Sequence, residues 1–442
     1  MMATTSMALL IGVVIATGCS PTRLGPPLRD DRTAPIREVL ANGIPVIIEE
    51  RPSSEVVALQ LWVKVGARDE SPSELGLAHY LEHMVFKGTA TRGPGFVDRD
   101  VERAGGRINA GTSLDYTYYH VLLPTHQVVA GIEMLADVSV NASLDEGLLG
   151  HEKSVVLEEM RLRDDNPRDR LARRLYTLVF EGHVYGRPMI GRPEAIRNVS
   201  REMLVGFYRR HYVTESFALV VAGTVKPDEV LRAAARTFGR LPRTGLSRLP
   251  PPLPAALRPV REHVDRAGSE LHLGMAWPGP RLDHADMPAV DLLVGILGRS
   301  RAARLTQSLR ERRGLVNAIA MSYTPLEAAG IVTLVAQLDP AKAHDAESAV
   351  HDELRRVRDE GVTDAELRRA VTAVEARREF AAETAEGRAY ALGRAVILWR
   401  IAEELAYVDR VRSVTMEQVR TAARQYLGPE RYARVTLGPP AR

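Results

Sequence analysis

Two histidines and a glutamate lie within five residues of one another in a stretch with a helical pattern. His79 and His83 are four residues apart, so on a helix their imidazoles share one face and can bind one metal ion. Glu82 lies beside His83 and can reach a water molecule on that metal without binding the metal. The order His-x-x-Glu-His inverts the commoner zinc-protease motif. It predicts metal-assisted hydrolysis with Glu82 as the general base; the alternative is a solvated helix face with two ordinary histidines.

The helix that carries this group is predicted within residues 76–89. An apolar stripe with helical period runs along it, formed by Leu77, Leu81, Met84 and Val85. The sequence Gly-Leu-Ala-His-Tyr-Leu-Glu-His-Met-Val-Phe-Lys-Gly-Thr resembles, nearly residue for residue, the core motif of the M16 metallopeptidases, which include pitrilysin, insulinase and mitochondrial processing peptidase. The chain is similar to the short bacterial type with one M16 pair of halves per subunit. This resemblance covers residues 35–440 and implies Zn²⁺ as the cofactor.

A third metal ligand must come from another element, because a catalytic zinc ion usually has three protein ligands and an open position for water. Glu152 and Glu159 are seven residues apart on a predicted helix, so they share a face. Residues 143–146 fit a capping box that opens this helix. The M16 resemblance implies that Glu159 is the third ligand and that Glu152 is an accompanying acid with a catalytic role. The alternative for Glu152 is a solvated helix charge.

The second part of the chain repeats the pattern of the first. Residues 202–223 and 417–438 both read as helix, aromatic residue, strand and glycine, offset by 214 to 215 positions. A Pro-rich stretch at residues 249–254 is the best linker candidate. The strand and helix mixture, with the M16 resemblance, predicts an α+β fold of two homologous halves. Each half is expected to be a mainly antiparallel sheet packed with helices, as in M16 and LuxS-like metalloenzymes.

The expected boundaries follow from these signals. The N-terminal half with the zinc site is predicted for residues 36–244, the linker for 245–262 and the C-terminal half without a zinc motif for 263–442. The chain has 442 residues, of which 45% are hydrophobic and 26% charged, which suits a protein of two or more domains. A formal net charge of +3 gives no reason to expect a nucleic-acid partner.

The N-terminus has the pattern of an export signal. Residues 8–16 are an apolar run too short to span a bilayer, and the segment that ends at Cys19 resembles a bacterial lipobox. We expect residues 1–19 to be a signal or lipoprotein leader, with residues 20–35 as a tether. Export to the periplasm, or attachment to the cell envelope by a lipid on Cys19, follows from this reading; the alternative is an uncleaved start. Cys19 is the single cysteine, so no intrachain disulfide can form.

Two further segments resemble the substrate-contacting parts of the M16 family. Residues 105–113 resemble the edge strand on which the peptide lies as an added strand, and Asn109 and Ala110 carry that match. An ordinary hairpin strand is the alternative. In the second half, Arg310 matches a family arginine that contacts substrate together with a tyrosine seven residues later. That later position is Asn317 in this chain.

The departure at Asn317 leaves three interpretations. A second M16-like subunit, or a second copy in a homodimer, supplies the Arg/Tyr pair; Asn317 itself donates the hydrogen bond; or the chain is a weakly active or non-catalytic assembly or binding subunit. The complete set of His79, His83, Glu82 and Glu159 favours catalysis. The sequence therefore predicts a zinc endopeptidase that hydrolyses short or unfolded peptides in a chamber, as the zinc-carrying subunit of a hetero-oligomer.

Overall fold

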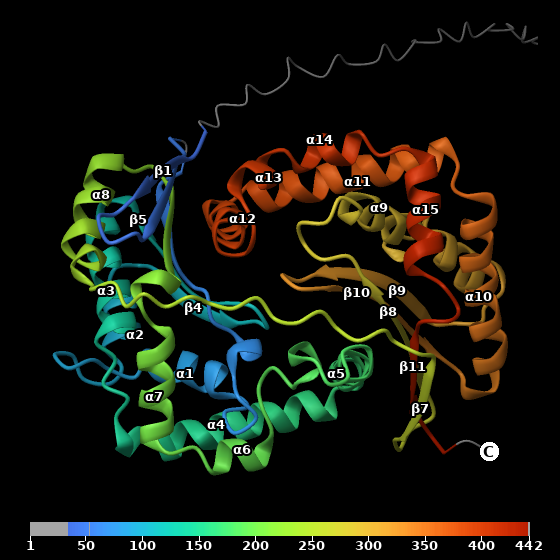
Figure 1. Cartoon of the computed structure of the whole chain (residues 1–442), viewed down its shortest axis with the longest axis horizontal. Helices are drawn as coiled ribbons and strands as arrows, with labels where there is room; N and C mark the ends of the chain where they lie inside the picture. Colours follow the sequence, from blue (N-terminus) through green and yellow to red (C-terminus); the bar gives the residue numbers. More distant parts are fainter. Residues whose placement is uncertain (1–33, 53, 441–442) are drawn as a thin grey trace, which may run out of the picture.

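The computed structural model describes residues 34–52 and 54–440, and it consists of two halves joined by an extended segment (Figure 1). The leader, Cys19 and nearly all of the predicted tether lie outside the described residues. Within the described residues, no helix has the length and apolar character needed to cross a membrane. Residues 242–259 contain no helix or strand, and β7 starts at Val260, inside the stretch predicted as the linker.

The first half is a sheet whose own helices pack on one face, while α12 (Ala385–Leu398) of the second half covers the other face. Its elements are β1 (Ile36–Val39), β2 (Pro45–Glu50), β3 (Val56–Val63), α1 (Leu77–Val85), α2 (Phe96–Arg103), β4 (Arg107–Thr112), β5 (Thr117–Pro124), α3 (Val128–Val140), α4 (Glu146–Asp165), α5 (Pro167–Val179), α6 (Pro193–Arg197), α7 (Arg201–His211), β6 (Phe217–Gly223) and α8 (Pro227–Arg236).

The second half repeats this architecture with more helix. Its elements are β7 (Val260–Asp265), β8 (Leu271–Gly279), α9 (Met287–Gly298), the π-helix η6 (Thr306–Arg312), β9 (Ala318–Pro325), β10 (Gly330–Leu338), α10 (Ala343–Glu360), α11 (Asp364–Ala382), α12 (Ala385–Leu398), α13 (Ile401–Leu405), α14 (Tyr407–Arg412), α15 (Met416–Tyr426) and β11 (Ala433–Gly438).

The two sheets have the same topology. The first has the strand order β1-β2-β6-β3-β5-β4 and the second β7-β11-β8-β10-β9, so β2, β6, β3, β5 and β4 correspond to β7, β11, β8, β10 and β9. In each sheet one pair is parallel, β2 with β6 and β7 with β11, and the remaining pairs are antiparallel. β6 is buried at all seven positions because both of its faces are covered. The predicted fold class of two homologous α+β halves is confirmed.

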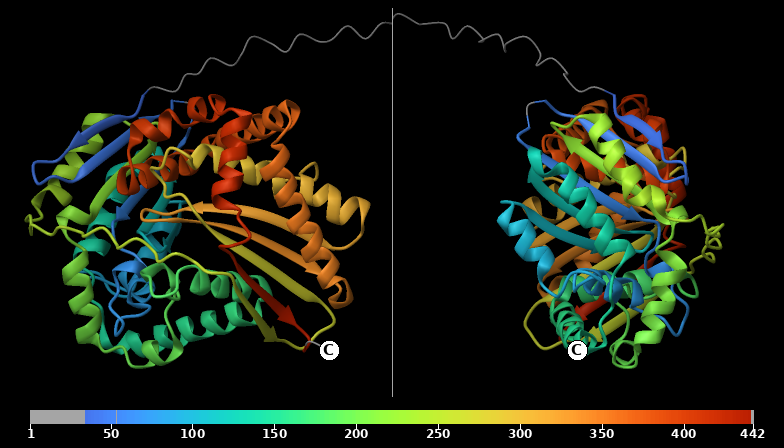
Figure 2. Two further views of the ribbon diagram at one scale, coloured as in Figure 1. Left: turned by 45° about the vertical axis from the view of Figure 1, so that its right-hand side comes forward. Right: turned by 90° about the vertical axis from the view of Figure 1, so that its left-hand side faces the viewer.

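One helix of each half packs on the sheet of the other half. α12 packs on β3 and β6 of the first sheet, and α5 packs on β8 and β11 of the second (Figure 1; Figure 2). Both contacts need a glycine. A Cβ on Gly393 would lie 1.9 Å from the indole nitrogen of Trp62, and one on Gly274 would lie 2.9 Å from carbon atoms of Leu171 and Leu175. The exchange makes the two halves interdependent.

A buried ionic network also ties the halves together. Asp115, which has no exposed surface, accepts hydrogen bonds from the Arg68 guanidinium at 3.0 Å and the Tyr185 hydroxyl at 2.7 Å. Its second oxygen accepts from the backbone N–H of Glu327, in the turn between β9 and β10, at 3.0 Å. Arg68 also pairs with the Glu327 carboxylate at 2.9 Å. These mutual contacts offset the cost of burying the charges, while the Nη2 of Arg68 is buried without a hydrogen-bond partner.

The predicted capping box at the start of α4 is wrong. α4 begins at Glu146 with Asp145 at the N-cap, and no side chain caps its first turn. Ser143 lies outside the helix because its backbone N–H and its hydroxyl both donate to the carbonyl of Gly88, at 3.0 and 3.2 Å. Leu144, with φ of 46°, then turns the chain into the helix.

Candidate metal centre

α1 presents the histidines, and a distant carboxylate fixes where the helix begins. Gly76 stands at its N-cap with φ of 96°, a conformation that glycine adopts without strain. The Glu70 side chain accepts the backbone N–H groups of Gly76 at 2.9 Å and Ala78 at 2.8 Å, which would otherwise have no partner. Burial raises the pKa of Glu70 to about 8. Sequence reasoning missed this residue, because an irregular loop brings it back to the helix.

The structure brings His79, His83 and Glu159 together. Glu159 Oε2 lies 3.3 Å from His79 Nε2 and 3.8 Å from His83 Nε2. One ligand atom from each of the three residues lies within 4.8 Å of the others. We call His79, His83 and Glu159 the metal group. α4 contacts α1 here, so the carboxylate of Glu159 comes from a different helix than the two histidines, as the sequence predicted for the third ligand.

These three side chains fit a zinc ion. Zinc ligands lie about 2.0–2.2 Å from the metal, so two ligand atoms on one ion are at most about 4.4 Å apart. The distances of 3.3 and 3.8 Å between Glu159 Oε2 and the two histidine nitrogens meet this condition. His79 is only 6% exposed, and its Nδ1 is a buried nitrogen without a hydrogen-bond partner. Burial lowers the pKa of His79 to about 4, which keeps its imidazole in the neutral form that a metal requires.

Glu82 is held beside this group by a strand of the sheet. The Thr112 hydroxyl, at the end of β4, donates to Glu82 Oε2 at 2.6 Å. Burial raises the pKa of Glu82, and the hydrogen bond from Thr112 works in the opposite direction. Thr112 was missed from the sequence, where it is one threonine among several in the hairpin. The hydrogen bond fixes the orientation of the Glu82 carboxylate beside the two histidines.

Glu152 contacts the second histidine and does not lie in solvent. It is 3% exposed; its Oε2 lies 3.4 Å from His83 Nδ1, and its Oε1 lies 2.7 Å from the ammonium of Lys87. A carboxylate on the far nitrogen of an imidazole fixes its tautomer and orientation. Glu152 is therefore a positioning residue for His83, and Lys87, the last charge of the motif, neutralises it.

Arg163 orients the carboxylate of Glu159. Its Nε donates to Glu159 Oε1 at 2.9 Å and its Nη2 forms an ion pair with the same oxygen at 2.7 Å, while Oε2 lies toward the two histidines. Arg163 is four residues after Glu159 on α4, a spacing at which helix side chains interact. That spacing is a sequence signal, although many such pairs occur on helix surfaces without function.

The predicted substrate strand lies at an open edge of the first sheet. β4 pairs only with β5 and ends the strand order. Asn109 accepts the N–H of Ala110 through its own side chain at 2.8 Å, which is a local contact. The edge position suits addition of a peptide strand, because one side of β4 has no strand neighbour.

Arg310 and Asn317 are not brought to the metal group. Arg310 lies on η6 of the second half and is exposed; Asn317 precedes β9 and donates its backbone N–H to Gln337 at 2.7 Å. Across residues 34–52 and 54–440, no hydrogen bond or ion pair joins either side chain to the metal group.

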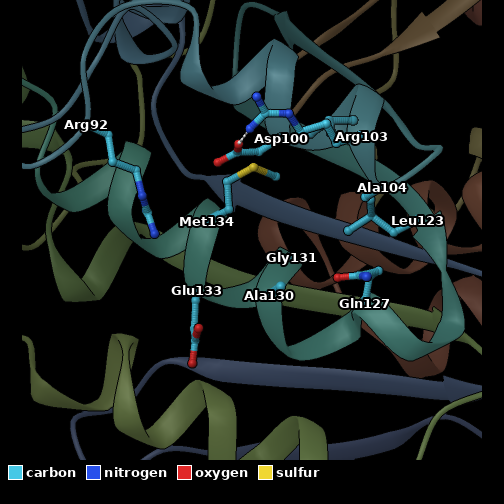
Figure 3. A pocket seen from close by; sticks show the side chains of 11 residues that line it. Arg92, Asp100, Arg103, Ala104, Leu123, Gln127, Ala130, Gly131, Glu133 and Met134 are labelled. Carbon is cyan, nitrogen blue, oxygen red and sulfur yellow. Dashed lines mark ion pairs between the residues drawn. The ribbon is translucent and has the colours of Figure 1, made fainter.

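A cavity between α2 and α3 takes no part in this site (Figure 3). Its rim carries Arg92, Glu133 and the ion pair of Asp100 with Arg103, and Leu123 and Met134 line its interior. None of the predicted site residues lines it.

Comparisons with known proteins agree with the geometry. Residues 45–192 match the family described as insulinase (peptidase family M16), and residues 198–374 match the peptidase M16 inactive domain. The chain is 30% identical to an uncharacterized zinc protease of Mycobacterium leprae, over 91% of both chains. It is also 30% identical to one of Mycobacterium tuberculosis strain H37Rv, over 92% of this chain and 93% of the relative.

Solved structures show the same fold. A protease from Helicobacter pylori matches with a TM-score of 0.86 and 23% identity, over 92% of this chain and 99% of that chain. A chain of complex III from Candida albicans matches with a TM-score of 0.79 and 14% identity, over 91% of this chain and 95% of that chain. The fold, the matched domains and the identity to zinc proteases lead to one conclusion, as the sequence predicted: this chain belongs to the M16 peptidase family.

Proposed function

We propose that this protein is a zinc-dependent endopeptidase that hydrolyses short or unfolded peptides. The observation that carries the proposal is the convergence of His79, His83 and Glu159, with Glu82 beside them and held by Thr112. Two histidines and a glutamate from two helices would hold the ion and leave a position open. When bound, zinc lowers the pKa of its water to ~7 and polarises the peptide carbonyl.

The chain's own groups then move the proton. Glu82 accepts a proton from the attacking water at its carboxylate and delivers it to the nitrogen of the leaving amine. Its raised pKa brings it closer to the range in which a carboxylate exchanges protons at neutral pH. Glu152 holds His83 in one orientation, and Arg163 does the same for Glu159. The open edge of β4 binds the main chain of the peptide, with little demand on its sequence.

The proposal includes a second subunit. Arg310 and Asn317 are exposed on the second half, and among the described residues no hydrogen bond or ion pair joins their side chains to the metal group. A partner with M16-like halves, or a second copy, would place an arginine and a hydrogen-bond donor opposite the zinc and enclose the substrate in a chamber. The alternative of a weakly active or non-catalytic assembly subunit draws support from the likeness to a complex III chain. The set of catalytic side chains favours the peptidase.

We also propose export and attachment to the cell envelope through Cys19. The support is the apolar run at residues 8–16 and the lipobox-like segment that follows it. Labelling cells with a palmitate analogue tests this proposal, because label on the wild type and none on Cys19→Ala is expected. Equal label on both proteins, or none on either, would contradict it.

Metal analysis coupled to peptide hydrolysis tests the main proposal. Purified protein should contain about one zinc per chain, lose hydrolysis of an unfolded peptide on chelation and regain it with added zinc. The double variant His79→Ala, His83→Ala should lose both metal and activity. Metal retained by that variant, or activity that resists chelation, would refute the proposal.

A further inference from the structure

A cavity of about 270 Å³ lies at the boundary between the two halves, next to residues that contact the metal group. Arg163, which bonds the Glu159 carboxylate, forms one part of its wall. Ser113 and Leu114 form another, and they directly follow Thr112, the residue that holds Glu82. A peptide added to the edge of β4 and passing the metal group therefore reaches this cavity next.

Both halves build the cavity, and its far wall is fixed. α5 contributes Tyr176, and the turn after β9 contributes Leu326. That turn is fastened to the first half, because Asp115 accepts the N–H of Glu327 and the Tyr185 hydroxyl accepts the N–H of Ala328, each at 3.0 Å. The aromatic and aliphatic walls are thus preorganised around the space and need no ordering when a ligand binds.

Arginines dominate the charge of the lining. Arg163, Arg173 and Arg187 line the cavity against one carboxylate, Asp169. Arg163 bonds Glu159 and Arg173 bonds Asp164, whereas Arg187 bonds a main-chain carbonyl, that of Glu70, and pairs with no carboxylate within residues 34–52 and 54–440. A guanidinium has five N–H donors, so each of these arginines has donors left for a ligand.

We propose that this cavity binds a carboxylate of the peptide substrate, on one side of the scissile bond. The proposal rests on the proposed peptidase function and specifies its substrate class. Arginine forks match the planar geometry of a carboxylate, and the apolar walls reduce the water that competes for it. The carboxylate is an acidic side chain within a few residues of the cleavage site, or the C-terminus of a short peptide.

Cleavage of matched peptides by the full chain tests this assignment. One peptide sequence is made with Glu or Gln at each of three positions on either side of the scissile bond, and with a C-terminal acid or amide. The kcat/KM of the Glu peptide should exceed that of its Gln twin by about three- to tenfold at positions on one side only. A preference for the acid over the amide identifies the C-terminus as the bound group.

Charge variants of the lining test whether the arginines act on the charge of the substrate. A purely structural role would leave the ratio of Glu to Gln peptide cleavage (the Glu:Gln ratio) unchanged. Arg173→Gln should reduce the Glu:Gln ratio by about threefold, mainly through KM, and Asp169→Asn should raise it. Arg232→Gln is the matched control, because Arg232 is an exposed arginine on α8 outside the cavity and should leave the ratio unchanged. Added salt should shrink the preference of the wild type.

These experiments distinguish failure of the carboxylate site from failure of the proposed peptidase function. Equal cleavage of Glu and Gln peptides and of acids and amides, with chelator-sensitive hydrolysis intact, would overturn the carboxylate site and leave the peptidase standing. Equal shifts of the ratio in Arg173→Gln and Arg232→Gln would do the same. Absence of chelator-sensitive hydrolysis of any peptide would refute the proposed function and, with it, this inference.

Discussion

Replacing Glu152 with glutamine should weaken zinc binding while the fold stays intact. Glu152 is buried, and its two oxygens serve different partners: His83 Nδ1 at 3.4 Å and the Lys87 ammonium at 2.7 Å. Glutamine has nearly the same size, but it has no charge and only one acceptor oxygen, so one partner would face an N–H donor. Loss of such an orienting partner weakens metal binding by about 10- to 100-fold, or about 1.4–2.8 kcal/mol. Lys87 is more than a third exposed and can be hydrated, so most of the loss should come from His83.

Competition between the protein and a chromogenic chelator measures the zinc Kd for this prediction. Glu158→Gln is the matched control, since Glu158 lies on the same helix but is exposed and pairs with Arg161 at 2.7 Å. Its Kd should stay within about twofold of the wild type, because exposed pairs contribute little. A Kd for Glu152→Gln equal to that of Glu158→Gln would refute the positioning role. A low kcat at saturating zinc would instead show that Glu152 acts directly in the reaction.

Three other changes test separate parts of the argument. Glu82→Gln should keep about one zinc per chain and lose about 10²–10⁴-fold in hydrolysis, measured by metal analysis and peptide cleavage; loss of the metal would disprove its role as base. Asp115→Ala should lower the free energy of unfolding by about 3–5 kcal/mol in urea titrations, because it leaves Arg68 buried with one partner fewer, whereas the exposed Asp165→Ala should cost less than about 1 kcal/mol. Glu70 has a folded-state pKa of about 8, above its usual value, so the folded state binds the proton more tightly and the free energy of unfolding should fall as pH rises from about 5 to 8. Glu70→Gln should remove this part of the dependence of stability on pH, and an unchanged dependence would contradict the raised pKa of Glu70.

Local patterns in the sequence were sufficient to predict much of the fold. The strand predicted at the end of residues 202–223 is β6, and the spacing of His79 and His83 placed them on one face of α1. The repeat of helix, aromatic residue, strand and glycine predicted the pairing of α7 and β6 with α15 and β11. These signals are periodic within one element, so a single sequence shows them.

The contacts that tune the site were not visible in the sequence. Glu70 caps α1 from an irregular loop, Thr112 reaches Glu82 from a strand, and Lys87, which follows α1, pairs with a buried acid on α4. The exchange of α5 and α12 between the halves has no periodic signature either, because each helix shows only an apolar face and not the sheet that this face covers. Chain topology decides all of these pairings, and one sequence does not determine it.

The second half shows what the same helix pair does without a metal. α9 and α11 correspond in topology to α1 and α4, and counting from the first residue of each helix places Ala289, Leu293 and Arg377 at the positions of His79, His83 and Glu159. Arg377 there pairs with the buried Asp291 at 3.2 Å, and Asp291 also accepts the Tyr407 hydroxyl at 2.9 Å. An ion pair thus crosses between the two helices where the first half has its metal ligands. Among the residues that the structure describes, such a group of metal-binding side chains occurs in the first half and not in the second, so this architecture forms without one, which supports a chemical role for His79, His83 and Glu159.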